Sequence, residues 1–182
     1  MEHPVPWVPK THVDRDRLFA GRSVHLIVYG RNKFGDLPEI LLNLPRTRRY
    51  LVLDCRRLYR DRDWRHHHLA DADGNNNKLV LQLTKHRKFA SLVDHAKSIM
   101  TPFFRNWEIR TGDIIIGLRC NGGRQRSVGL ARILEYFMKE RGARVTRCYM
   151  NQRDFCGCSE CHGQTDDIFL KAVCAFSRLW GA

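Results

Sequence analysis

The chain of 182 residues is long enough for one domain with a buried core, and its 43% hydrophobic and 10% aromatic content excludes a disordered protein. Its net charge of +13 favours anionic partners such as RNA or phosphorylated metabolites, although a basic protein without any polyanionic partner has the same composition. No apolar run reaches transmembrane length and the first twenty residues lack the apolar core of a signal peptide, so we expect a cytoplasmic protein without a membrane partner.

Strand patterns alternate with helical patterns along the chain. Residues 1–22 carry three prolines and are expected to form an irregular arm, followed by one domain over residues 23–182. This alternation is typical of a single layered α/β domain with a mostly parallel sheet flanked by helices. In chain order we expect a strand at 23–29, a loop at 30–36, a short helix at 37–44, a strand at 50–55, a surface loop at 59–77, a helix at 89–103, a strand ending at Cys120, a helix from about Arg124 to Gly142, a strand at 145–149 and a helix at 166–179.

A glycine-rich turn joins the third expected strand to the helix that follows it. Asn121, Gly122 and Gly123 form this turn, and glycines let backbone N–H groups approach an anion at a helix N-terminus. Arg126 can add bidentate hydrogen bonds and Ser127 a hydroxyl, so the pattern predicts a phosphate-binding loop. The alternative is a tight strand–helix turn in which glycine serves only the backbone geometry.

The same residues read Cys-x-x-Gly-x-x-Arg-Ser from Cys120 to Ser127. This spacing resembles the phosphate loop of cysteine-dependent phosphatases, in which a strand-terminal thiolate attacks phosphorus. Arg119 stands where those enzymes commonly have a histidine. Several aspartates are candidates for the general acid, and the sequence does not choose between them: Asp54, Asp63 and Asp154.

A wider resemblance rests on three blocks in order. Residues 116–128 read Ile-Gly-Leu-Arg-Cys-Asn-Gly-Gly-Arg-Gln-Arg-Ser-Val, which is similar to the signature Ile-Gly-Cys-Thr-Gly-Gly-x-His-Arg-Ser-Val of RapZ-type proteins. Residues 29–38 resemble that family's Phe-Gly-Phe-Lys-x-Gly-Ile-Pro, and residues 53–58 its Phe-Asp-Val-Arg-Phe-Leu. The chain therefore resembles the C-terminal domain of that family. No Gly-x-x-x-x-Gly-Lys-[Ser/Thr] motif accompanies it, so ATP or GTP hydrolysis is not expected.

The resemblance implies an α/β domain with a phosphosugar pocket, which in bacteria is associated with binding small regulatory RNAs. By position, Asp54 and Arg56 would face the ligand. Gln125 replaces a loop histidine of the family, which leaves the identity of the sugar open. The phosphate itself would be held by Asn121, Gly122, Gly123, Arg126 and Ser127.

Seven cysteines in a chain without a signal peptide indicate a reducing compartment. Four ligand-type residues lie close together near the C-terminus and are candidates for a structural zinc site, the alternative being reduced loop cysteines: Cys156, Cys158, Cys161 and His162. Cys55 and Cys174 lie in apolar runs and are expected in the core.

Two functions follow from these patterns. The first is a binding module for a phosphorylated small molecule, with RNA as a candidate second partner. The second is a cysteine-dependent phosphatase with Cys120 as nucleophile, so the sequence leaves open whether the protein is an enzyme. It also leaves the oligomeric state open.

Overall fold

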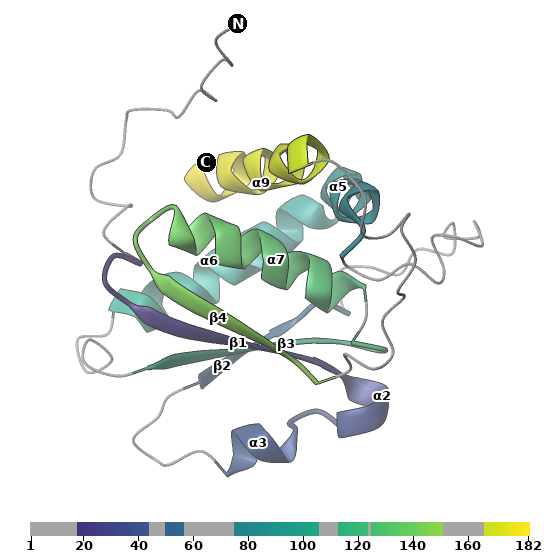
Figure 1. The fold of residues 1–182 in the computed structure, drawn as a ribbon, viewed down its shortest axis with the longest axis vertical. Helices are drawn as coiled ribbons and strands as arrows, with labels where there is room; N and C mark the ends of the chain where they lie inside the picture. The colour runs from purple at the N-terminus through teal and green to yellow at the C-terminus, as the bar shows by residue number, and fades with distance from the viewer. Residues whose placement is uncertain (1–17, 44–49, 57–74, 106–112, 124, 151–165) are drawn as a thin grey trace, which may run out of the picture.

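Four strands form one parallel sheet in the computed structural model, which describes residues 18–43, 50–56, 75–105, 113–123, 125–150 and 166–182. All neighbouring strands pair in parallel, in the order β2-β3-β1-β4 (Figure 1). The expected α/β domain with a parallel sheet is thereby confirmed. The strands are β1 (Ser23–Gly30), β2 (Tyr50–Asp54), β3 (Ile114–Cys120) and β4 (Arg144–Tyr149).

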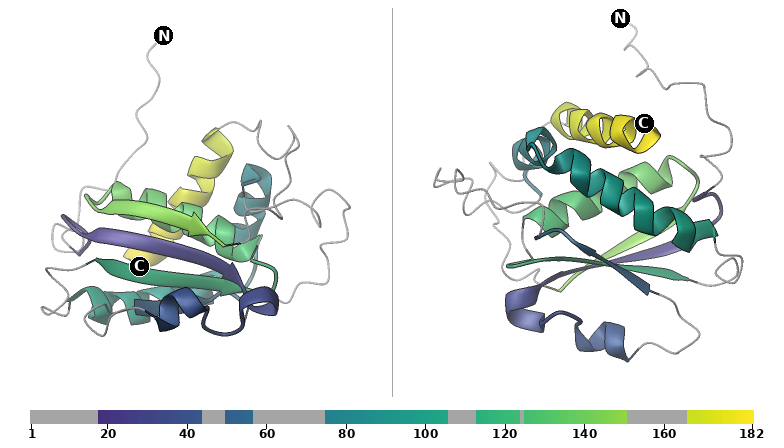
Figure 2. Two further views of the ribbon diagram at one scale, coloured as in Figure 1. Left: turned by 60° about the horizontal axis from the view of Figure 1, so that its bottom comes forward. Right: turned by 180° about the vertical axis from the view of Figure 1, so that it is seen from behind.

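Helices cover both faces of the sheet. The two short helices lie on one face, and the longer helices lie on the other, with α6 and α7 nearest the strands and α9 above them (Figures 1 and 2). Because both faces are covered, β1 and β3 are buried almost throughout, which explains their continuous apolar sequence. The helices are α2 (Arg31–Phe34), α3 (Glu39–Leu42), α5 (Asn77–Lys85), α6 (Phe89–Arg105), α7 (Arg126–Lys139) and α9 (Asp166–Gly181).

An aromatic cluster packs the long helices against one another. Phe137 of α7 packs edge-to-face on Phe176 of α9 with ring centroids 5.0 Å apart. Phe19 packs in the same way on Phe104 of α6 at 4.9 Å. Such pairs stabilise a core beyond the area that they bury. Phe19 lies inside the predicted N-terminal arm, so the last residues of that segment belong to the core; the domain boundaries themselves stay a prediction.

A smaller apolar cluster lies on the opposite face. Tyr29 of β1 and Leu41 of α3 are fully or almost fully buried there. Gly117 of β3 makes room for α3, because a Cβ at this position would lie 3.1 Å from the Leu41 Cδ1 atom. This packing holds the α2–α3 segment across the sheet.

The structure departs from the sequence expectations at three places. Helix α5 was not predicted, although Asn76 caps it by accepting a hydrogen bond from the Leu79 amide at 3.0 Å. Residues 31–34 form one helical turn inside the predicted loop. Cys174 is exposed, so its predicted core position was wrong: its helix turns that side chain away from the apolar stripe of α9. Among the described helices, none is long and apolar enough to cross a membrane.

Candidate functional site

The loop after β3 lies against the end of β1. We call residues Asn121, Gly122 and Gly123 the glycine loop. A Cβ on Gly30 would lie 2.6 Å from the carbonyl carbon of Gly122, so only glycine lets the two backbones approach this closely. The Asn32 amide donates a hydrogen bond to the Asn121 carbonyl at 3.1 Å, which ties α2 to the same loop.

The glycine loop leads directly into the N-terminus of a long helix. Gly123 has φ +68°, a left-handed conformation that favours glycine, and α7 begins three residues later at Arg126. Gly122 is exposed and has open space around its Cα. An exposed glycine turn followed by the first turn of a helix presents backbone N–H groups and a positive dipole end to an anion.

The sulfur of Cys120 lies beneath this loop. Its Sγ accepts a hydrogen bond from the Gly123 amide at 3.2 Å and lies 3.1 Å from the Ser127 Oγ. Cys120 is only 2% exposed and Ser127 is fully buried. The Gly123 amide therefore faces the sulfur beneath the loop, whereas the solvent-exposed side of the loop lies at Asn121 and Gly122.

Charged side chains gather at the carboxyl ends of β2 and β3, beside the glycine loop. The Asp54 carboxylate accepts hydrogen bonds from the Arg56 Nη2 at 2.7 Å and from the Arg119 Nη2 at 2.9 Å. Arg119 also donates to the Asp36 Oδ1 at 3.0 Å, and Arg31 donates to that same oxygen at 2.8 Å. This cluster, three arginines and two aspartates, carries one excess positive charge.

Protonation in the cluster follows from these contacts. Partial burial acts to raise the pKa of Asp54, but hydrogen bonds from Arg56 and Arg119 hold it well below its ordinary range. The bond to Asp54 also raises the pKa of Arg56. Burial raises the pKa of Tyr29 to about 12, and its hydroxyl donates to the Asp36 carbonyl at 2.9 Å. Asp54 and Arg56 are therefore ionised at neutral pH, and the Tyr29 hydroxyl is neutral.

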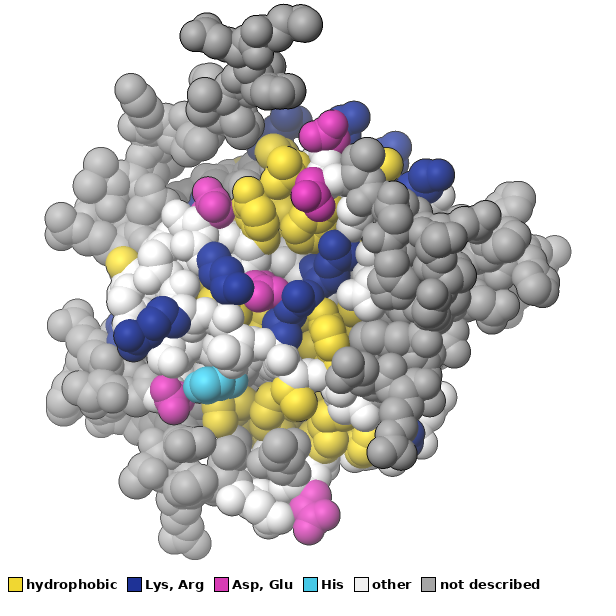
Figure 3. All heavy atoms as spheres, viewed as in Figure 1, with side chains coloured by type: hydrophobic (Ala, Val, Ile, Leu, Met, Phe, Trp, Pro, Cys, Tyr) yellow, Lys and Arg dark blue, Asp and Glu magenta, His cyan; other side chains and the backbone are white. Residues whose placement is uncertain are grey.

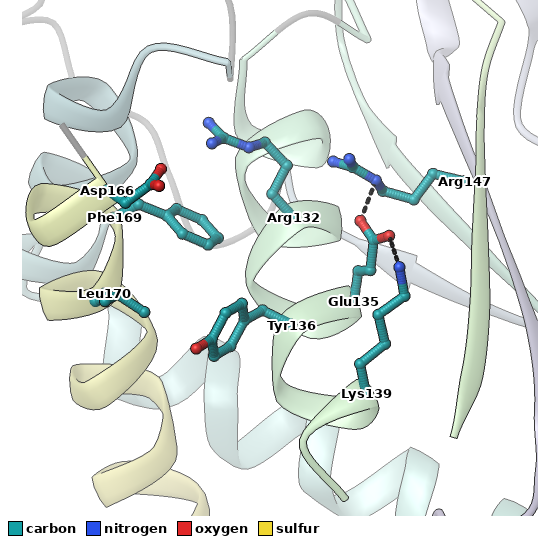
Figure 4. A pocket seen from close by; sticks show the side chains of 8 residues that line it. All are labelled: Arg132, Glu135, Tyr136, Lys139, Arg147, Asp166, Phe169 and Leu170. Atoms are coloured by element: carbon teal, nitrogen blue, oxygen red, sulfur yellow. Dashed lines mark hydrogen bonds and ion pairs between the residues drawn. The ribbon is translucent and has the colours of Figure 1, made fainter. Parts of the chain in front are cut away.

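A hollow lies on another part of the surface, between α7, β4 and α9. We call it the α7–α9 groove; it has a volume of about 430 Å³ (Figure 4). Glu135 lies between Arg147 and Lys139 and pairs with both, while the Arg132 guanidinium lies 4.5 Å from the Phe169 ring centroid. The lining residues are Arg132, Glu135, Tyr136, Lys139, Arg147, Asp166, Phe169 and Leu170.

The structure brings part of the predicted site together. Asp54, Arg56 and Cys120 lie at the same edge of the sheet as the glycine loop, and Arg126 and Ser127 lie in the first turn of α7. Sequence reasoning missed Gly30 and Asp36, which reach this edge only through the strand order, and it noted Arg119 without giving it a place in the site. It also missed the α7–α9 groove, whose only sequence signal was polar and aromatic residues at helical spacing: Arg132, Glu135, Tyr136 and Lys139.

The predicted zinc ligands lie outside the described residues: Cys156, Cys158, Cys161 and His162. Asp63 and Asp154 lie outside them too. Cys148, which precedes these residues in the sequence, is exposed on β4. Within the described ranges, no group of three or more His, Cys, Asp or Glu residues is arranged to hold a metal ion.

Comparison with known proteins gives one match. A family model described as the RapZ C-terminal domain matches residues 42–155, which is more than half of the chain. The matched range contains β2, β3, the glycine loop, α7 and β4. Searches among curated proteins and among solved structures found no match.

Proposed function

Because the chain belongs to the RapZ C-terminal domain family, we propose that it is a phosphate-binding module whose ligand is a phosphorylated small molecule, most simply a phosphosugar. The phosphate would lie on the glycine loop and the N-terminus of α7. Arg126 in the first helical turn would complete its coordination, and the buried Ser127 hydroxyl would support the loop from below through the Cys120 sulfur.

One observation carries this proposal: the close contact between Gly30 and Gly122. A strand–helix turn that served only the chain direction would not need a second glycine on the neighbouring strand. Here two glycines pack backbone to backbone, while the far side of Gly122 stays open to solvent. That arrangement supports a loop whose amides are held in a fixed shape toward a ligand.

The charged cluster suits the sugar part of such a ligand. Asp54 remains ionised and carries acceptor oxygens for sugar hydroxyls, while Arg56 and Arg119 hold its orientation. In the described part of the chain, the Arg119 Nε is a buried donor without a hydrogen-bond partner. Buried donors without a partner are rare in folded proteins, and a polar ligand bound at the cluster would account for this one.

Calorimetric titration tests the proposal. Inorganic phosphate and a hexose 6-phosphate are titrated into wild type and into Arg126→Ala, with Arg178→Ala, an exposed arginine of α9, as the matched loss of one charge. We expect at least tenfold weaker binding for Arg126→Ala and no change for Arg178→Ala, because a charged hydrogen bond contributes about 1.5–3 kcal/mol. Equal affinity in all three proteins would remove Arg126 from the site.

A second function, phosphoester hydrolysis, is favoured by the hydrogen bond from the Gly123 amide to the Cys120 sulfur. The Cys120 thiolate would attack phosphorus, the ester P–O bond would break, and water would then release phosphate and regenerate the thiolate. Asp54 cannot protonate the leaving oxygen, because its arginine partners keep it ionised. Hydrolysis of p-nitrophenyl phosphate by wild type and by Cys120→Ser tests this mechanism. Activity that survives in Cys120→Ser would exclude it, and activity present in wild type but lost in Cys120→Ser would support it.

RNA is the proposed macromolecular partner, supported by the charge of +13 and by the α7–α9 groove. Cationic side chains lie near the centre of this face beside an apolar patch (Figure 3). Tyr136 is 37% exposed and offers a ring on which a base can stack. Anisotropy of a labelled single-stranded RNA should show affinity falling steeply with salt, with Tyr136→Ala weaker by about fivefold or more and Tyr136→Phe unchanged. Absence of binding at low salt would refute the RNA proposal.

A further inference from the structure

Two buried cysteines lie side by side on neighbouring strands. Asp54 of β2 pairs with Arg119 of β3, and the Cys55 amide donates to the Arg119 carbonyl at 2.9 Å, which extends the parallel ladder by one residue. Cys55 and Cys120 are therefore the next two residues across the ladder. Both belong to the same core cluster, with exposures of 0% and 2%.

The spacing of such neighbours suits a disulfide. Adjacent strands lie about 4.7–4.9 Å apart. The Cα atoms of a disulfide usually lie about 4.4–6.8 Å apart. The Cα separation expected for Cys55 and Cys120 therefore falls within the range of a disulfide, and the bond closes once the two Cβ atoms approach within about 4.5 Å.

Both thiols are free and have other contacts at present. The Cys120 sulfur accepts a hydrogen bond from the Gly123 amide. The Cys55 thiol donates a hydrogen bond to the Leu53 carbonyl, with 3.8 Å between sulfur and oxygen. Burial, and then the neighbouring Cys120, raises the pKa of the Cys55 thiol. The two cysteines thus differ in their contacts: the Cys120 sulfur accepts a hydrogen bond from a backbone amide of the glycine loop, and Cys55 is a protonated thiol behind it.

We propose that Cys55 and Cys120 form a reversible dithiol switch that, when oxidised by a peroxide, disables the phosphate loop. The Cys120 thiolate attacks one peroxide oxygen, the O–O bond breaks, and Cys120 becomes a sulfenic acid while hydroxide leaves. The Cys55 sulfur then attacks the Cys120 sulfur, the S–O bond breaks, and the departing hydroxide takes the Cys55 proton. Two thiols and one hydrogen peroxide give one disulfide and two waters.

Oxidation changes the ligand site because of where the Cys120 sulfur lies. A bond to Cys55 takes this sulfur away from the Gly123 amide and the Ser127 hydroxyl, so the glycine loop loses an internal contact. This consequence rests on the proposed phosphate site, whereas disulfide formation does not. We expect phosphate affinity to fall at least tenfold on oxidation and to return after treatment with dithiothreitol.

Peptide mapping tests the switch. Wild type is treated with hydrogen peroxide, alkylated under denaturing conditions and digested with trypsin without reduction. Cleavage at the arginines of the sequence gives peptide 50–56 with Cys55 and peptide 120–124 with Cys120, so the expected product is a cross-link of these two short peptides. A product in which Cys120 is oxidised to sulfinic or sulfonic acid, or is joined to another cysteine, while Cys55 is alkylated, would overturn the proposal.

Variants at Cys55 and at the two exposed cysteines provide a further test. Cys55→Val places an apolar residue of similar size directly after β2, and Cys55→Ala serves if valine does not fit. In either, Cys120 should proceed to irreversible sulfinic acid, and dithiothreitol should not restore the thiol. Cys148→Ser and Cys174→Ser change exposed cysteines and should leave the cross-link intact. If wild type forms the cross-link on oxidation but binds no phosphate in its reduced form, the dithiol switch is supported and the proposed phosphate site is refuted.

Discussion

Gly30 at the end of β1 and Gly122 after β3 are in backbone contact, so close that a Cβ on Gly30 would lie 2.6 Å from the Gly122 carbonyl carbon. Ninety-two positions separate the two residues in the sequence, and the parallel pairing of β1 with β3 brings them together. The shape of the glycine loop therefore depends on the neighbouring strand as well as on its own residues.

Replacing Gly30 with alanine should destabilise the fold by about 1–3 kcal/mol, because backbone atoms of Gly122 and Gly123 must move to admit the methyl group. Gly181→Ala is the control, since a Cβ there meets no atom within 4 Å. Urea denaturation measures both, and the control should stay within about 0.5 kcal/mol of wild type. Equal stability of Gly30→Ala and wild type would contradict the packing.

Replacing Gly122 with alanine should separate ligand binding from stability. Its φ is not positive and its Cβ would meet open space, so the fold should tolerate the methyl group. The same methyl group would occupy the space above the loop amides, so phosphate affinity should fall about tenfold or more. Calorimetric titration beside a thermal melt checks both results; undiminished affinity would mean that phosphate does not approach this side of the loop.

The pH dependence of stability should carry a contribution from Asp54. Its pKa is lower in the folded protein than in the unfolded chain, where it is about 3.9. Asp54 therefore stabilises the fold fully above about pH 4, and this contribution is lost as the pH falls further. Asp54→Asn should lower the free energy of unfolding at pH 7 by about 1–3 kcal/mol and flatten its decline in acid. Asp94 is exposed, so Asp94→Asn should change neither the free energy of unfolding at pH 7 nor its decline in acid. Similar effects of the two variants would contradict the stabilising role of the Asp54 contacts.

Adjacent aromatic residues of α7 should differ sharply in their effect on stability. Phe137 is fully buried between Phe19, Phe176 and Trp180, and its truncation to alanine should cost about 3–5 kcal/mol. Tyr136 is 37% exposed and makes one edge-to-face contact with Phe169 at 6.0 Å, so Tyr136→Ala should cost about 1 kcal/mol or less. Thermal unfolding of both variants compares them. A larger loss for Tyr136→Ala would contradict the arrangement of the core.

The sheet could be predicted because its strands carry their own signal. Residues 23–29 and 114–120 are apolar almost throughout, as expected for strands buried on both faces. Helix α6 likewise shows its buried stripe in the sequence. Helix α5 was missed because its nine residues are few and follow an asparagine-rich segment, although Asn76 was a recognisable cap.

The ligand site could be predicted only in part. Asp54 ends β2 and the glycine loop follows β3. Since the carboxyl ends of parallel strands meet at one edge, the proximity of these residues follows from local patterns. The contacts of Gly30 with Gly122 and of Asp36 with Arg119 depend instead on β1 lying beside β3. Strand order is a property of the whole sheet, and no local pattern of these residues encodes it.

Phosphate on the glycine loop is the central claim, and the backbone amides of Gly122 and Gly123 report on it directly. In ¹⁵N-labelled protein titrated with a hexose 6-phosphate, these amides and that of Ser127 should shift progressively and saturate together. The Gly181 amide, at the far end of α9, should not move. Saturable shifts confined to other parts of the molecule, with Gly122 and Gly123 unmoved, would contradict the phosphate site.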